Sequence, residues 1–448
     1  MSILGLLAVA AGLTLATDDA RPNVVIVYAD DMGYTDLGCF GGDLARTPNI
    51  DRMAREGLRL TRYYSASPIC SPSRCGLLTG QFPARWRITS YLQTRAGNRA
   101  CGQDDFLDPE APSLPRALQA AGYATAHVGK WHLGGGRDVV DPPKFAAYGY
   151  DLGLGTYESP EPHPDLTATD WIWSPRDPVK RWDRTRWMVD RTLEFLKEHQ
   201  GKPCFVNLWL DDVHTPWVPT EGDQDAGPDG KGRGKASTPE RLRGVLEELD
   251  RQIGRLLDAI REESSGRSTL VLFMSDNGPL PTFERRRTGG LRGSKLSLYE
   301  GGIRMPFIAW GPGIVPPGAI NTASVVGAVD LFPTLCALAG APLPDGYRGD
   351  GEDVSAFLRG ERPGRSKPLL WEYGRNPDSF AHPRGDDRSP NVAILEGDWK
   401  LLINDDGRGA ELYDLSTDPE ERYDRAEAHP DLARRLSAEA LKWRRAMP

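Results

Sequence analysis

Cysteine is scarce in this sequence, and its residues are not arranged in closely spaced pairs. They occupy positions 39, 70, 75, 101, 204 and 336 of a 448-residue chain. Without pair spacing, the sequence implies neither a disulfide framework nor a structural zinc site. We therefore expect stability to come from a hydrophobic core, which a chain of this length can bury.

Long apolar runs are also missing after the N-terminus. The apolar run at residues 3–15 is too short to span a bilayer comfortably, and small and then acidic residues follow it. We interpret residues 1–17 as a signal peptide, cleaved near Ala16 or Thr17, and expect an exported protein, periplasmic or extracellular. The first residues depart from the usual pattern because they carry only the α-amino charge. No later segment reads as an integral membrane helix.

Positive charge is not in excess, since 55 lysine and arginine residues face 63 aspartate and glutamate residues, a formal net charge of −8. This balance argues against nucleic acid or an acidic membrane surface as a partner. An anionic substrate would therefore need a local basic cluster, against a mildly repulsive overall field. The remaining composition is that of an ordinary globular protein, and no internal repeat is visible.

Short apolar runs alternate with helical patterns through most of the chain. Strands are expected at 23–28, 123–128, 204–210, 268–274 and 306–310. Helices are expected from 48 to Leu58, and at 114–121, 182–198, 238–260 and 331–338. The alternation predicts βαβ units, and hence an α/β fold with a large, mainly parallel sheet flanked by helices.

The C-terminal part differs in style. After a Gly/Pro/Arg-rich connector at 340–367, short runs predict a small antiparallel sheet, closed by a helix at 431–445. We therefore expect a catalytic domain at 21–340 and a smaller α+β subdomain at 341–448. Residues 134–178 are interpreted as surface loops that set specificity, and the polar stretch at 221–236 as a mobile excursion.

Four predicted strands end in ionisable or ligating side chains. These are Asp30 and Asp31, Lys130 and His132, His214, and Asp276 and Asn277. In parallel α/β sheets the site lies outside the carboxyl ends of the strands. Residues far apart in sequence are therefore expected to meet at one edge of the sheet.

Two of these strand ends have the composition of a metal site. Asp30, Asp31, Asp276 and Asn277 offer only oxygen ligands, which suit Ca²⁺ or Mg²⁺ and not zinc. Taken alone, the Asp pair favours a solvated turn or a cap, and Asp276-Asn277 favours a tight turn. Their joint position at two central strand ends favours a shared cation site.

The stretch 68–80 carries the most specific pattern. Pro72 suits the first position of a helix, so Cys70 is expected at or just before a helix N-terminus, where an anion is favoured. Arg74 lies four positions later and shares the face of Cys70. A helix start with a buried thiol is the simpler interpretation of these three residues alone.

The fuller string resembles the signature of the type I, formylglycine-dependent sulfatases, a family that includes arylsulfatases and carbohydrate sulfatases. The matching residues are Cys70-Ser71-Pro72-Ser73-Arg74 and Leu77-Leu78-Thr79-Gly80, with further family-like strings at 129–134, 397–401 and 411–415. The resemblance extends from Asn23 to about Glu421. It implies an alkaline-phosphatase-like core and a maturation enzyme that converts Cys70 to formylglycine (3-oxoalanine), whose hydrate is the nucleophile.

The resemblance also implies roles for the other candidate residues. Calcium, rather than magnesium, would be held by Asp30, Asp31, Asp276, Asn277 and the modified Cys70. Lys130 and Lys295 match the sulfate-binding lysines, and Arg74 would orient the hydrate. His214 would protonate the leaving alcohol, and His132 would accept a proton to expel sulfate. Structural roles are expected for Asp36, His127 and Arg304, and no special role for His163, His199, His382 and His429.

We therefore expect a sulfuric ester hydrolase acting on a sulfated small molecule or saccharide. One alternative is a phosphodiesterase or phosphonate hydrolase on the same scaffold, because phosphate and sulfate are both tetrahedral. The other is a non-catalytic carbohydrate-binding relative, if Cys70 stays unmodified. Besides its substrate, the expected partner is the maturation enzyme.

Overall fold

The computed structural model describes residues 21–167, 173–226, 237–263 and 267–448. The predicted signal peptide, and most of the polar excursion predicted at 221–236, lie outside the described residues. Within them, no helix combines the length and the apolar character needed to cross a membrane. All six cysteines lie in the described parts and are free thiols.

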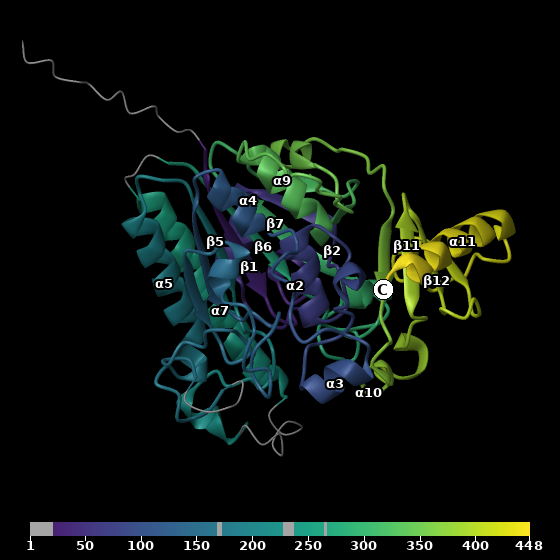
Figure 1. Ribbon diagram of the computed structural model, residues 1–448, viewed down its shortest axis with the longest axis horizontal. Helices are drawn as coiled ribbons and strands as arrows, with labels where there is room; N and C mark the ends of the chain where they lie inside the picture. The colour runs from purple at the N-terminus through teal and green to yellow at the C-terminus, as the bar shows by residue number, and fades with distance from the viewer. Residues whose placement is uncertain (1–20, 168–172, 227–236, 264–266) are drawn as a thin grey trace, which may run out of the picture.

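A mixed sheet forms the centre of the large domain (Figure 1). In the described residues it has nine strands in the order β4-β3-β5-β1-β6-β7-β2-β8, with β9 paired to β2. The first five of these pair in parallel, whereas β7 is antiparallel to both of its neighbours. The strands are β1 (Asn23–Ala29), β2 (Leu58–Tyr64), β3 (Ala124–Gly129), β4 (Leu152–Gly155), β5 (Cys204–Trp209), β6 (Thr269–Ser275), β7 (Arg304–Trp310), β8 (Ala319–Asn321) and β9 (Val326–Gly327).

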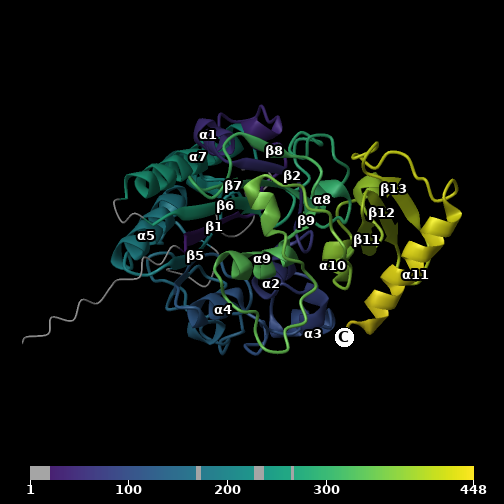
Figure 2. The same cartoon turned by 90° about the horizontal axis from the view of Figure 1, so that it is seen from above.

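Helices cover both faces of this sheet, which confirms the predicted α/β fold (Figures 1 and 2). Helices pack on both faces because the central strands are apolar on both sides. In β1, Val24 and Ile26 point into one core and Val25 and Val27 into the other. The first core is covered by α2 (Cys70–Thr79), α4 (Leu114–Ala120) and α9 (Leu331–Leu338). The second is covered by α1 (Pro48–Glu56), α5 (Arg184–Glu198) and α7 (Pro239–Glu262). Shorter helices are α3 (Arg95–Ala100), α8 (Glu300–Ile303) and α10 (Pro377–Phe380).

The sequence patterns missed several strands. Leu58 continues the apolar stripe of α1, yet it is the first residue of β2, which lies between β7 and β8. The helix ends before Gly57, where a Cβ atom would lie 2.2 Å from the Ala309 carbonyl oxygen. This close approach of the backbone to β7 allows only glycine and turns the chain into the sheet. The short strand β4 was likewise hidden in the predicted loops at 134–178.

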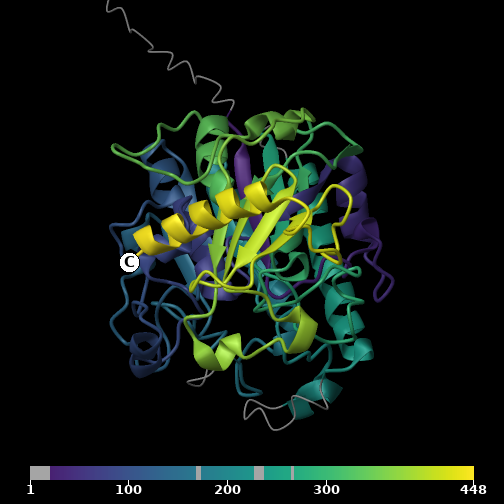
Figure 3. The same cartoon turned by 90° about the vertical axis from the view of Figure 1, so that its right-hand side faces the viewer.

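The C-terminal subdomain is a four-stranded antiparallel sheet with one helix lying across it (Figure 3). Its elements are β10 (Leu369–Glu372), β11 (Val392–Glu396), β12 (Trp399–Ile403), β13 (Glu411–Asp414) and α11 (Pro430–Ala446). The antiparallel tail was predicted, but β10 was not. Trp371 of β10 donates its indole N–H to the Ser65 carbonyl at 2.8 Å, which ties the subdomain to the large domain.

Candidate active site

The carboxyl ends of β1 and β6 place three carboxylates side by side. Asp30 and Asp31 follow β1, and Asp276 follows β6, its neighbour in the sheet. The Asp31 amide donates to Asp276 Oδ1 at 3.2 Å, and all three side chains are buried. Such crowding is costly without compensating charge, and burial together with Asp30 raises the pKa of Asp276 to about 7.

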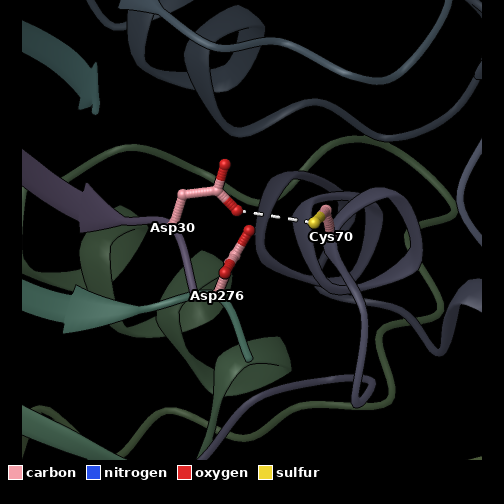
Figure 4. A group of neighbouring side chains, drawn as sticks. All are labelled: Asp30, Cys70 and Asp276. Atoms are coloured by element: carbon pink, nitrogen blue, oxygen red, sulfur yellow. Dashed lines mark hydrogen bonds between the residues drawn. The ribbon is translucent and has the colours of Figure 1, made fainter. Parts of the chain in front are cut away.

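Cys70 begins helix α2 and faces these carboxylates. Its Sγ lies 3.4 Å from Asp30 Oδ1, and one ligand atom from each of Asp30, Cys70 and Asp276 falls within 4.8 Å of the others (Figure 4). Pro72 is the third residue of the helix and not the first, because the helix begins at Cys70 itself. The thiol therefore sits in the first turn, among amides that α2 leaves unpaired.

Three cationic side chains balance the three carboxylates. Lys130 Nζ lies 2.5 Å from Asp30 Oδ2, and Lys295 Nζ lies 2.6 Å from Asp31 Oδ1. The same two Nζ atoms lie 3.5 and 3.6 Å from Cys70 Sγ. Arg74 donates to Asp276 Oδ2 at 2.7 and 3.1 Å. The cations thus surround residue 70, where an anionic group would gain the most from them.

The donor set fits a hard cation. Asn277 Nδ2 donates to Asp31 Oδ1 at 2.7 Å, while Asn277 Oδ1 is buried without a hydrogen-bond partner among the described residues. An orphaned amide oxygen beside three carboxylates is the oxygen-only arrangement that Ca²⁺ or Mg²⁺ prefers. A divalent cation would leave the cluster with excess positive charge and so favour an anionic substrate.

The two predicted proton carriers lie on different elements. His132 follows β3 with φ 54°, so the backbone at this residue is left-handed and not extended. Its Nε2 lies 3.2 Å from the Leu92 carbonyl oxygen. His214 follows β5, and its Nε2 lies 3.7 Å from Asp31 Oδ2. Burial lowers the pKa of His132 to about 3 and that of His214 to about 4, so both are neutral at pH 7.

A cavity of about 430 Å³ opens above this cluster. Its lining includes most of the predicted residues: Asp30, Cys70, Lys130, His132, His214 and Lys295. It also includes residues that were not singled out from the sequence: Ile69, Tyr91, Arg137, Thr156, Tyr157, Glu158, Arg181, Asp211, Leu280, Leu296 and Ser379. The segment 134–178 was expected to carry specificity, but its lack of periodicity concealed which of its side chains turn inward.

The residues predicted to be structural do not line this cavity. Asp36 pairs with Arg287 at 2.6 Å, and Arg304 donates to the Thr61 carbonyl at 2.7 Å. His127 is buried, with its ring stacked on Phe145 and edge-on to the rings of Trp131 and Trp209. These contacts brace the strands and loops that position the site.

Comparison with known proteins identifies the family. A model described as "Sulfatase" matches residues 22–341, and one described as "N-sulphoglucosamine sulphohydrolase, C-terminal" matches residues 294–445. The chain is 28% identical to an N-acetylgalactosamine-6-O-sulfatase of Bacteroides thetaiotaomicron, with 93% of this chain and 92% of that protein covered. It is 31% identical to human arylsulfatase A, with 93% and 85% covered.

Solved structures agree with the sequence comparison. The crystal structure of Ps i-CgsB in complex with k-i-k-neocarrahexaose superimposes with a TM-score of 0.75 at 27% identity, covering 94% of this chain and 92% of that one. The same layered fold and the same span of chain are therefore shared. On these grounds the chain belongs to the sulfatase family and is a sulfuric ester hydrolase.

Proposed function

We propose that this protein hydrolyses sulfate esters of carbohydrates through a nucleophile derived from Cys70, with a calcium ion at Asp30, Asp31, Asp276 and Asn277. The main support for this proposal is that Cys70 lines the cavity and contacts both Lys130 and Lys295. Those ammonium groups suit the oxygens of a tetrahedral anion attached to residue 70.

The thiol itself is a poor candidate for the nucleophile. Burial, and next the nearby Asp30 carboxylate, raise the pKa of Cys70, so the unmodified side chain is protonated at neutral pH. Conversion to formylglycine by a maturation enzyme would replace sulfur by oxygen at this position. The hydrated aldehyde would supply a hydroxyl nucleophile with no need for a thiolate.

The surrounding side chains have separable tasks. Bound calcium would supply Lewis acidity at the sulfate and the residue-70 oxygens. Lys130 and Lys295 hold the sulfate oxygens, and Arg74 orients residue 70 from the next turn of α2. The side chain of His214 is 25% exposed and is neutral before substrate binds; the bound sulfate anion would favour its protonated form, from which it donates a proton to the departing alcohol. His132 accepts a proton from residue 70 when sulfate leaves.

The cavity lining supports a saccharide as substrate. The lining combines the aromatic side chains of Tyr91 and Tyr157 with the polar side chains of Arg137 and Glu158. Among the similar proteins are an N-acetylgalactosamine-6-O-sulfatase and a structure bound to a neocarrahexaose. Both features favour a sugar ring over a purely aromatic alcohol.

The direct test measures sulfate release by ion chromatography and 4-nitrophenol release by absorbance. The substrates are 6-sulfated N-acetylgalactosamine, 4-nitrophenyl sulfate and bis(4-nitrophenyl) phosphate, and the enzyme is expressed with and without a formylglycine-generating enzyme. We expect sulfate release only after maturation, and none from Cys70→Ala. Faster turnover of the phosphodiester would instead favour the phosphodiesterase alternative, and no turnover after verified maturation would contradict the proposal.

A further inference from the structure

The imidazole of His132 is held at one nitrogen only. Its Nε2 lies 3.2 Å from the Leu92 carbonyl oxygen and 3.3 Å from Glu158 Oε2. Its Nδ1 is buried and has no hydrogen-bond partner in the part of the chain that the structure describes. Both neighbours of Nε2 are acceptors, so the neutral ring carries its proton on Nε2 and leaves Nδ1 free to accept one.

The loop that carries Glu158 is fixed to the segment of His132. The His132 amide donates to the Glu158 carbonyl at 2.9 Å, and the Arg137 amide donates to the Tyr157 hydroxyl at 2.8 Å. A Cβ atom at Gly135 would lie 2.2 Å from the Ser159 carbonyl oxygen, so only glycine allows the segment after His132 to approach the segment after Glu158 this closely. The backbone of Glu158 is therefore held beside the segment of His132.

Arg137 completes the arrangement around Glu158. Its Nη2 lies 2.7 Å from Glu158 Oε1, and its Nη1 donates to the Leu92 carbonyl at 2.9 Å. The Leu92 amide in turn donates to Ser71 Oγ of α2 at 3.0 Å. Burial would raise the pKa of Glu158, but His132 and Arg137 lower it, so the carboxylate stays ionised.

We propose that Glu158 is a positioning residue for His132. With the Leu92 carbonyl it holds the proton of the ring on Nε2, and its negative charge offsets the positive charge that the ring gains when Nδ1 takes a proton. The inference rests on the proposed function, in which His132 accepts the proton from residue 70. It adds a buried carboxylate, from the loops between β3 and α5, to the groups on which turnover depends.

The charges around His132 give Glu158 this role. The ring is also subject to Lys130, Arg137 and Arg74, and each of these cations disfavours the charged imidazole. Glu158 acts in the opposite direction. Its removal would leave these three cations without the carboxylate that opposes them, and a weaker base slows proton transfer.

The first test is spectroscopic and independent of turnover. Nitrogen chemical shifts of ¹⁵N-histidine-labelled full-length protein distinguish the two neutral tautomers, with assignment by the His132→Gln spectrum. We expect the Nε2–H form for His132, and a pKa lower by about one unit in Glu158→Gln. In Arg137→Met, which removes an opposing charge, the pKa should rise. A ring protonated on Nδ1, or an unchanged pKa in Glu158→Gln, would overturn the inference.

The second test is kinetic, on matured enzyme with 4-nitrophenyl sulfate. We expect kcat of Glu158→Gln to fall on the order of 10-fold or more, with a smaller change in KM, and partial recovery in Glu158→Asp. A kcat equal to that of the parent would overturn the inference. Activity that survives in Cys70→Ala would refute the proposed function instead, while leaving the tautomer result standing.

Discussion

Lys295 reaches across the site from the loop after β6 to the end of β1, where its Nζ lies 2.6 and 2.7 Å from the two oxygens of Asp31. The same nitrogen lies 3.6 Å from Cys70 Sγ. A cation bound by Asp31 would compete for this carboxylate and release the ammonium group toward a substrate anion. In the proposed function, the two residues would therefore link cation binding to sulfate binding.

Lys295→Ala should slow the hydrolysis of sulfate esters. We expect kcat/KM for 4-nitrophenyl sulfate to fall about 100- to 1,000-fold, because a charge aimed at the transferring group is lost. The matched control is Lys144→Ala, since the Lys144 side chain is 77% exposed and pairs only loosely with Glu161 at 3.7 Å. Equal activities of the two variants in steady-state assays would show that Lys295 does not contact the substrate.

Calcium should stabilise the folded protein through the carboxylate cluster. After chelation, adding Ca²⁺ to 100 times its Kd should increase the free energy of unfolding by about 3 kcal/mol, since the ion binds only the assembled site. Differential scanning calorimetry would record this as a higher Tm. In Asp276→Asn the increase should largely vanish, whereas a parent protein indifferent to Ca²⁺ and Mg²⁺ would argue against the cation site.

Much of this site follows from local sequence. Asp30, Lys130, His214 and Asp276 were predicted because each follows a buried strand, and parallel strands end at a common edge. Residues supplied by loops, such as Glu158, have no such rule, since their direction depends on the turns and close backbone contacts of the folded loop. Tertiary packing likewise determines the conformation of Leu58, whose local sequence pattern is helical although its backbone pairs in the sheet.

The interface between the two domains should be sensitive to pH. Lys400 of β12 lies 2.9 Å from both Glu300 and Glu421, and all three groups are buried. Burial raises the pKa of Glu421 from its ordinary value of 4.5 to about 7. The folded state thus binds the proton more tightly, so this contribution to stability is full below about pH 4.5 and is lost as the pH rises toward 7.

Glu421→Gln tests this behaviour because the amide cannot ionise. Between about pH 5 and pH 8 the parent should lose on the order of 1–3 kcal/mol more stability than the variant, as measured by urea unfolding at each pH. Parallel pH profiles for the two proteins would mean that Glu421 does not retain its proton in the folded state.

Trp371 should make a large contribution to domain docking. Trp371→Ala removes a buried indole and leaves the Ser65 carbonyl without its 2.8 Å donor, so we expect a loss of about 3–5 kcal/mol. The control is Tyr423→Ala, whose ring is 61% exposed and should matter little. Chemical denaturation that gave both variants the same midpoint would contradict the packing described for β10.

The central claim is that residue 70 is no longer cysteine in the active enzyme. Mass spectrometry of the peptide containing residue 70, from protein of measured specific activity, tests it most directly. We expect a peptide that has lost one sulfur and two hydrogens and gained one oxygen, in a proportion that rises with sulfatase activity. Full activity in protein whose residue 70 carries only the unmodified thiol would contradict the claim.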